Sequence, residues 1–253
     1  MFLGGTVRSV EDAGLLKAMG LDFGEISISD VRRFQEALPD YKREIRGADF
    51  FFLCHGPQEG DPNDIHSLEN VYLPKLMETI PLVYELGSSL LTIHLWMDRR
   101  FVSQEAIVYK VGLLRRLLDL ADTYRVKLNI ENLSEGLEDF LPVFETLPNL
   151  GLTLDVGHGQ LLAETNTSFD FLRGMPERIR HVHIHDNVGG SSHKDDLHLP
   201  VGSGSIDFKA IFRAIASIGY RGTFTIELVP EKIKLCLDKV RELLKSTGID
   251  REN

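Results

Sequence analysis

The sequence of 253 residues is poor in cysteine and in basic charge. Its two cysteines, Cys54 and Cys236, lie in separate apolar stretches without the close spacing of a metal-binding pair. We therefore expect reduced thiols, as in a cytoplasmic protein, and not a disulfide framework. With 28 basic and 38 acidic residues the formal net charge is −10, which disfavours a nucleic-acid partner. The total charge leaves such a partner open, because it says nothing about a local site.

Long apolar runs and glycine-rich phosphate loops are also missing. No run approaches the roughly 18 apolar residues of a membrane span, so we expect no membrane partner and a cytoplasmic location. The stretch GGTVRS after the first predicted strand does not match GxGxxG, and no GxxxxGK[ST] occurs. This absence argues against a doubly wound nucleotide-binding sheet. What remains is an ordinary globular composition, 43% hydrophobic and 26% charged.

Short apolar runs alternate along the chain with longer amphipathic stretches. We predict strands at Met1–Thr6, Phe23–Ile28, Phe50–His55, Leu90–Leu95, Val126–Glu131, Leu152–Val156, His181–His185 and Thr223–Leu228. We predict helices at Val10–Met19, Ser67–Leu86, Ser103–Tyr124, Glu138–Leu147, Phe208–Ser217 and Glu231–Leu244. Repeated strand–helix units in a chain of this length indicate an α/β protein with one (β/α)8 barrel. We expect a single domain over residues 1–253, with a polar tail from about residue 247.

The alternation of side chains within the strands carries the functional prediction. In Val126–Glu131 the apolar residues share one face, and Asn129 and Glu131 lie on the other. The apolar face packs on the helices of a barrel, so the polar series points inward, and barrel active sites lie where strands end. In six strands that series reaches a metal-capable side chain: His55, His94, Glu131, Asp155, His183 and Glu227. Buried together, carboxylates and imidazoles need a partner or a cation, and this mixture suits zinc or manganese.

Further metal-capable residues follow two of these strands. His158 comes three residues after Asp155, and Gly157 between them allows a sharp turn. A glycine- and serine-rich loop after the seventh strand ends in Asp196-Leu197-His198. His181 lies deeper in its strand, and we expect it only to form hydrogen bonds within the barrel. His66 lies outside the pattern, and we interpret it as a surface histidine.

Seven motifs occur in order along nearly the whole chain: CHGP, LTIHLW, LNIEN, LTLDVGH, HVHIHDN, DLHLPVGSGSIDF and TIELV. In these motifs the chain resembles the xylose isomerase-like TIM-barrel superfamily, which includes sugar isomerases, ketose 3-epimerases, inositol-catabolism enzymes and the endonuclease IV group. In epimerase-like members a Glu, an Asp, a His and a Glu hold one divalent ion. The resemblance implies that role for Glu131, Asp155, His183 and Glu227. His158 matches the histidine, three residues after the aspartate, that commonly contacts substrate in that family.

The endonuclease IV group has a larger centre with three zinc ions. Its additional ligands match His55, His94, His158, Asp196 and His198. The chain departs from that group's motifs: it has Val156-Gly157 within a motif that is typically DTCH, His185 in place of an asparagine, and Asp196-Leu197-His198 in place of DRH. The missing arginine removes an expected phosphate contact.

These observations favour an enzyme of carbohydrate metabolism, a metal-dependent isomerase or epimerase acting on a sugar or sugar phosphate. We expect Glu131 and Glu227 to exchange a proton with the substrate through a metal-stabilised enediolate. His158, Lys194 and Trp96 are candidate substrate-binding residues. We expect one zinc or manganese ion, with room for up to three.

Two other functions remain open. The first is a multinuclear zinc phosphodiesterase similar to endonuclease IV, a group also called AP endonuclease family 2. The second is a sensor or carrier that only binds a metal or a sugar, although pure binding does not need a pair of proton-transferring carboxylates. The sequence makes no prediction of the oligomeric state.

Overall fold

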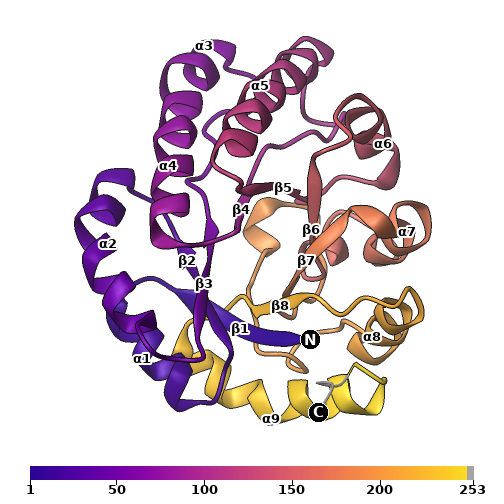
Figure 1. Cartoon of the computed structure of the whole chain (residues 1–253). Helices are drawn as coiled ribbons and strands as arrows, with labels where there is room; N and C mark the ends of the chain where they lie inside the picture. Colours follow the sequence, from indigo (N-terminus) through magenta and orange to yellow (C-terminus); the bar gives the residue numbers. More distant parts are fainter. Residues whose placement is uncertain (250–253) are drawn as a thin grey trace.

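The structure of the protein is a computed structural model that describes residues 1–249. Parallel strands pair in sequence order, and the last pairs with the first, so that the sheet closes into a barrel inside a ring of helices (Figure 1). The single (β/α)8 barrel is thus confirmed, and each predicted strand end is right within two residues. The strands are β1 (Phe2–Val7), β2 (Phe23–Ser27), β3 (Phe51–His55), β4 (Leu90–Ile93), β5 (Lys127–Glu131), β6 (Gly151–Asp155), β7 (Ile179–Ile184) and β8 (Thr223–Ile226).

The helices lie between the strands. They are α1 (Val10–Ala18), α2 (Val31–Ile45), α3 (Ile65–Ser67), η1 (Leu68–Tyr72), α4 (Leu73–Leu86), α5 (Gln104–Thr123), α6 (Leu137–Thr146), η2 (His158–Gln160), α7 (Ser168–Gly174), η3 (Pro176–Arg178), η4 (His193–Asp195), α8 (Phe208–Ser217) and α9 (Pro230–Ser246). Side-chain caps begin several of them: Ser103 accepts the amide of Ala106, and Asp207 accepts that of Ala210.

The sequence prediction omitted two helices. Helix α2 is rich in charged residues and buries only Phe34, Leu38 and Tyr41, one narrow stripe at helical spacing. Helix α7 has seven residues, too few for the periodicity to be visible. Both helices nevertheless help to complete the outer ring.

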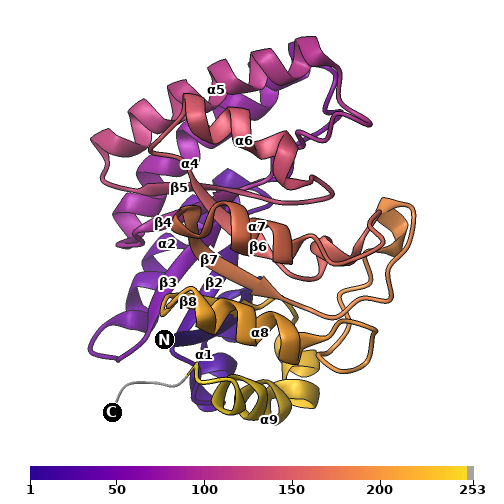
Figure 2. The ribbon, with the colours of Figure 1, turned by 90° about the vertical axis from the view of Figure 1, so that its right-hand side faces the viewer.

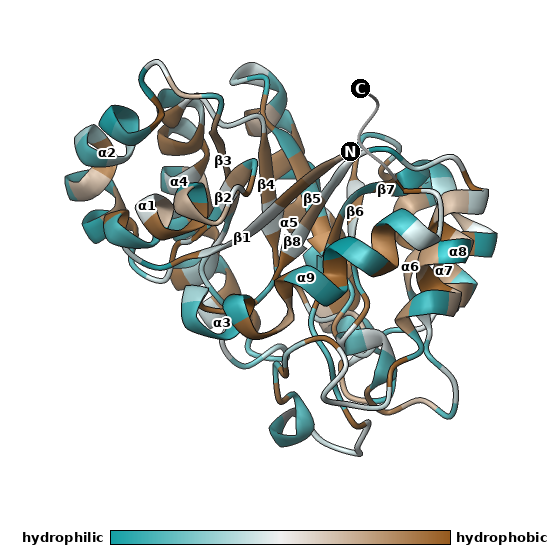
Figure 3. Cartoon of the chain, turned by 90° about the horizontal axis from the view of Figure 1, so that it is seen from below, coloured by the Kyte–Doolittle hydropathy of each residue, from teal (hydrophilic) through white to brown (hydrophobic). Residues whose placement is uncertain are grey.

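Two apolar clusters follow from the strand alternation. The large cluster fills the space between the barrel and the helices and includes Phe52 and Cys54. A small cluster of Phe23, Leu53 and Leu90 lies apart from it, on the inward-facing series of strands β2, β3 and β4. Figure 3 shows the same division, with apolar strands inside and hydrophilic outer faces on α2, α8 and α9.

A polar layer separates the small cluster from the strand ends. Thr92 and Thr153 share a hydrogen bond of 2.7 Å between their hydroxyls, and the amide of Asn129 donates to Thr153 at 3.0 Å. Gly151 makes room for it, because a Cβ there would lie 2.1 Å from Asn129 Oδ1. Each of Thr92, Asn129 and Thr153 precedes a predicted site residue by two positions, so the next inward layer consists of site residues.

The two ends of the barrel differ. In Figure 2 the long connection between β7 and α8 extends beyond the strand ends, whereas the N-terminus lies on the opposite side. The expected polar tail begins later than residue 247: Ile249 is fully buried, and its amide donates to Leu244 O at 3.0 Å. Residues 250–253 of that tail lie outside the described residues. No helix of residues 1–249 is long and apolar enough to cross a bilayer.

Candidate metal centre

Four predicted ligands meet where strands β5 to β8 end. Glu131 and Asp155 are the last residues of β5 and β6, His183 lies on β7, and Glu227 follows β8. His183 Nδ1 lies 3.4 Å from Glu131 Oε2, 3.7 Å from Asp155 Oδ2 and 3.5 Å from Glu227 Oε2. Ligand atoms around a tetrahedral ion with bonds of about 2.1 Å lie about 3.4 Å apart. The spacing therefore suits one divalent ion.

Unpartnered atoms provide an independent test of this fit. Among the described residues, Glu131 Oε1, Asp155 Oδ2, His183 Nδ1 and Glu227 Oε2 are buried without a hydrogen-bond partner. One atom comes from each of the four residues. Buried carboxylate and imidazole atoms are costly to leave unpaired, and a cation coordinated by all four would satisfy them together.

Glu131 is also the centre of a second group. Its Oε2 lies 3.0 Å from His55 Nε2 and 3.3 Å from His94 Nε2, and its Oε1 lies 3.1 Å from His158 Nδ1. The structure thus brings His55 and His94 to the carboxylate that also belongs to the first group. His55, His94 and Glu131 form a candidate site for another ion.

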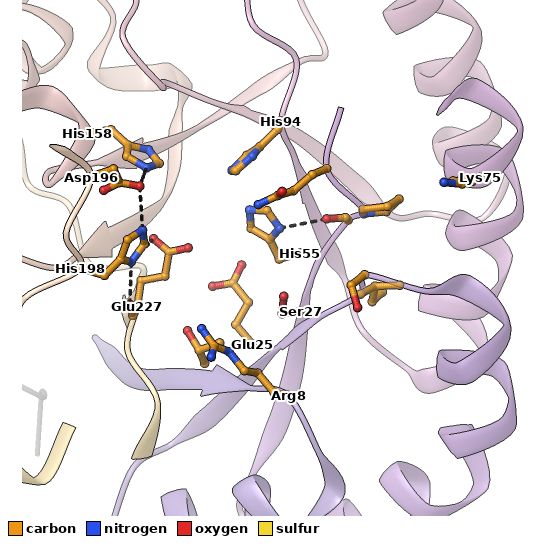
Figure 4. Close-up of a pocket in the computed structure, with 16 residues that line it drawn as sticks. Arg8, Glu25, Ser27, His55, Lys75, His94, His158, Asp196, His198 and Glu227 are labelled. Carbon is orange, nitrogen blue, oxygen red and sulfur yellow. Dashed lines mark hydrogen bonds and ion pairs between the residues drawn. The ribbon is translucent and has the colours of Figure 1, made fainter. Parts of the chain in front are cut away.

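A third group contains the two loop residues predicted from spacing. Asp196 Oδ2 contacts His158 Nε2 at 3.3 Å and His198 Nε2 at 3.0 Å (Figure 4). The ring of His198 stacks on that of His185, with centroids 3.9 Å apart. His158, His185, Asp196 and His198 offer ligand atoms close enough for one ion.

Hydrogen bonds to backbone carbonyls fix the ring orientation of each of three imidazoles. The Nδ1 atoms of His55, His158 and His198 lie 3.1, 3.1 and 3.0 Å from the carbonyl oxygens of Gly56, Asn132 and Glu227. An Nδ1–H that donates to a carbonyl leaves Nε2 deprotonated and free to bind a metal. The three Nε2 atoms point to carboxylates of the centre.

A buried aspartate anchors the loop that carries Asp196 and His198. Asp186 accepts the amides of Gly202 at 2.7 Å and Gly204 at 2.8 Å on Oδ2, and that of Asn187 at 2.8 Å on Oδ1. A Cβ at Gly204 would lie 2.3 Å from Asp186 Oδ1, so only glycine permits this approach. The segment DLHLPVGSGSIDF is therefore held in one backbone conformation by its hydrogen bonds to Asp186, an arrangement that we call the Asp186 clamp.

Sequence reasoning missed Glu25 and His185 as site residues. Glu25 Oε2 lies 2.9 Å from His183 Nε2 and 3.2 Å from His181 Nε2. His185 Nε2 lies 3.1 Å from Asp155 Oδ1. The signal was present, because both residues belong to the inward-facing series of their strands. His181 forms hydrogen bonds with Thr223 and Thr225 deep in the barrel, as expected.

Interactions between the buried carboxylates and imidazoles outweigh the effect of burial on their pKa values. Burial alone would raise the pKa of Glu131, but His183 and His94 hold that pKa well below its usual value. Burial alone would lower the pKa of His183, but Glu25 and Glu131 raise that pKa well above its usual value. Burial alone would also lower the pKa of His198, but its hydrogen bond to Asp196 raises that pKa to about 9. Glu131 is thus ionised, and protons on His183 and His198 occupy positions that a cation would take.

The centre opens into a cavity of about 690 Å³ that reaches Arg8 and Lys75. Lys194, predicted to bind substrate, is exposed in η4 and lines neither this cavity nor its neighbour within the described chain. Trp96 is half-buried and lines the neighbouring cavity together with His94 and His158.

Fold and site together define a (β/α)8 barrel with a cluster of metal-type ligands at the carboxyl ends of its strands. The chain belongs to the xylose isomerase-like TIM barrel family, whose model matches residues 13–247. Sugar isomerases and epimerases are among its relatives.

Three relatives illustrate this. Inosose isomerase of Bacillus subtilis is 25% identical over 182 residues, which cover 68% of this chain and 64% of that protein. A solved D-tagatose 3-epimerase-like protein superposes with a TM-score of 0.83 at 20% identity, covering 98% of both chains. The IOLI protein, solved with a binding zinc atom, superposes with a TM-score of 0.75 at 21% identity, covering 99% of this chain and 97% of that one. The chain spans 55%, 70% and 64% of the length of the first curated relatives it matches.

Proposed function

We propose that the protein is a divalent-metal-dependent isomerase or epimerase that acts on a sugar or sugar phosphate. One observation carries the proposal: Glu131, Asp155, His183 and Glu227 offer ligand atoms close enough together for one ion, and each of the four has a buried atom without a hydrogen-bond partner. The relatives named inosose isomerase, ketose 3-epimerase and L-ribulose 3-epimerase support the reaction class. The zinc atom of the IOLI protein supports a divalent metal.

The carboxylates supply the proton chemistry in this proposal. A bound divalent ion would act as a Lewis acid on a substrate carbonyl and its neighbouring hydroxyl. Glu227 lines the large cavity, and neighbouring His183 helps to keep its pKa below the usual value although burial opposes this, so it is an ionised base within reach of substrate. Glu131 is fully buried, and both its oxygens contact imidazoles. For Glu131 to return the proton to the substrate, one of its carboxylate oxygens must first break its contact with a histidine.

Solvent deuterium tests this mechanism. Ketoses, ketose phosphates and an inosose would be incubated with zinc- or manganese-loaded protein in deuterated buffer, and products analysed by NMR. We expect deuterium at the carbon next to the carbonyl, lost in Glu227→Gln and retained in Glu231→Gln, an exposed acid at the start of α9. Product formation without deuterium would indicate a hydride shift and remove the proton-transfer role. No product from any of these substrates would refute the proposed reaction.

A specific observation also favours a second function, a multinuclear zinc phosphodiesterase. The groups His55–His94–Glu131 and His158–His185–Asp196–His198 adjoin the first group and contain every extra ligand expected for a three-zinc centre. Ion content by mass spectrometry and cleavage of DNA with an abasic site distinguish the two functions. One ion per chain without cleavage supports the isomerase, whereas two or three ions with efficient cleavage support the phosphodiesterase.

A further inference from the structure

A second cavity of about 390 Å³ adjoins the metal centre. It shares His94, His158 and Asp196 with the large cavity, so the two spaces meet at the site itself. Its remaining wall is largely apolar and is formed by Trp96, Phe101, Leu133, Leu161 and Leu162. A molecule held at the centre can therefore extend past His94 and His158 onto an apolar surface.

Two aromatic rings form the most distinctive part of this wall. Trp96 and Phe101 stack with centroids 5.1 Å apart and planes 23° apart. The indole N–H donates to Ser134 Oγ at 2.8 Å, so the only polar group of Trp96 is satisfied. Phe101 remains 44% exposed, so part of its ring is accessible to a ligand.

Three charged side chains, of which Glu135 and Lys110 are buried, brace the wall. Glu135 is fully buried and accepts the amides of Met97 at 2.6 Å and Leu133 at 2.7 Å. Lys110 donates to Trp96 O at 2.7 Å, and Arg100 donates to Leu162 O at 3.0 Å. The aromatic pair is thus ordered before any ligand arrives, which lowers the entropic cost of binding.

Two serine hydroxyls of the wall are already in use. Ser134 Oγ donates to Asp98 at 2.7 Å while it accepts from Trp96, and Ser192 Oγ donates to Asp195 at 3.1 Å. A hydroxyl-rich ring placed against this part of the wall would lose water and find neither hydroxyl free to donate. An aromatic ring needs no hydrogen-bond partner there and would gain contact with the aromatic pair.

We propose that this cavity is a subsite for an aromatic substituent, so that the substrate is a sugar that carries an aryl group and retains a carbonyl next to a hydroxyl. The sugar lies at the metal centre, and the aryl group lies against Trp96 and Phe101. The inference rests on the proposed function for its reacting half, but the aryl subsite is a binding property that can be measured without any turnover.

Trp96 is the only tryptophan of the sequence, so its emission reports directly on this cavity. Phenyl and methyl β-D-glucopyranoside would be titrated separately into zinc-loaded protein while that emission is followed. We expect the phenyl glycoside to bind at least tenfold more tightly and to change the emission. Equal affinities, or no saturable change with either glycoside, would overturn the proposal.

Two variants locate the effect. Phe101→Ala removes half of the aromatic pair, and we expect it to reduce the phenyl preference to threefold or less. Phe2→Ala is the matched control, because Phe2 is 50% exposed and lies in β1, outside both cavities. Circular dichroism checks that both fold. An unchanged preference in Phe101→Ala would also overturn the subsite.

The outcomes separate the two proposals. A phenyl preference without isomerisation of any sugar would retain the subsite and refute the proposed function. Isomerisation of free sugars without a phenyl preference would do the reverse.

Discussion

A buried ion pair behind Trp96 allows a quantitative prediction. Lys110 Nζ lies 2.6 Å from Glu59 Oε1, and the two side chains are 0% and 6% exposed. Glu59 also accepts a hydrogen bond from the amide of Trp96 at 2.7 Å, and Lys110 donates one to the Trp96 carbonyl. The ion pair therefore holds both backbone polar groups of Trp96. Lys110→Met keeps the length of the side chain but leaves the Glu59 carboxylate buried without its cation.

The expected loss is large. Breaking one partner of a buried pair costs about 3–5 kcal/mol. For a chain of this size each kcal/mol shifts the midpoint of thermal unfolding by about 2–4 °C, so we expect a fall of about 6–20 °C. Lys17→Met is the control, because the Lys17–Glu44 side chains are 29% and 31% exposed. A partly exposed pair of that kind is screened by solvent, and we expect it to contribute only about 1 kcal/mol.

The loss depends on pH in a defined direction. Burial raises the pKa of Glu59 even with Lys110 beside it. Without the lysine that pKa rises further above its value in the unfolded chain, so stability present at low pH is lost as pH rises. We therefore expect Lys110→Met to lose more stability at pH 8 than at pH 5.

Thermal unfolding gives the midpoint shift, and urea unfolding at pH 5 and pH 8 gives the stability differences, both followed by circular dichroism and by Trp96 emission. The double variant Lys110→Met with Glu59→Gln leaves no buried charge, and we expect it to regain most of the loss. A Lys110→Met variant as stable as Lys17→Met would refute the reasoning. So would a double variant as unstable as the single one.

Three further predictions concern the centre. Glu25→Gln removes the carboxylate behind His183 and should weaken zinc binding about 10–100-fold in chelator competition; unchanged affinity would deny Glu25 a positioning role. Zinc uptake at pH 7 should release protons, because neighbouring carboxylates outweigh burial and raise the pKa of His158 and His183; calorimetry in two buffers measures this, and no release would contradict it. Gly157→Ala places a Cβ 2.1 Å from the imidazole of His185, and we expect it to lower the free energy of unfolding by about 1–3 kcal/mol in urea. Gly14→Ala is the control: it has free space on helix α1 and should raise that free energy by about 0.5–1 kcal/mol. Equal effects of the two substitutions would refute the clash.

The period of two along a strand explains what the sequence could reveal. It fixes which residues face inward, so Glu131, Asp155 and His183 could be placed on one layer without a structure. The same rule applied to β2 points to Glu25, which was missed because its strand ends in serine and not in a metal-capable residue.

Contacts between distant loops could not be predicted in this way. Glu59 and Lys110 lie in different connections, and no spacing rule pairs them. The apolar cavity depends on where the segments after β4, β5 and β6 come to rest. The position of Lys194 outside both cavities could not be predicted for the same reason, because its loop is held through long-range contacts with Asp186.

Glu131 belongs to two ligand groups at once, and this has a consequence for metal occupancy. A first ion bound through Glu131 changes the charge that a second ion meets, so the two binding steps are thermodynamically linked, and the linkage is reciprocal. Zinc titration should then show unequal steps. If zinc binds both groups, the number of ions per chain would depend on the zinc concentration as well as on the sequence, so the ion count that separates the two candidate functions has to be read at saturating zinc.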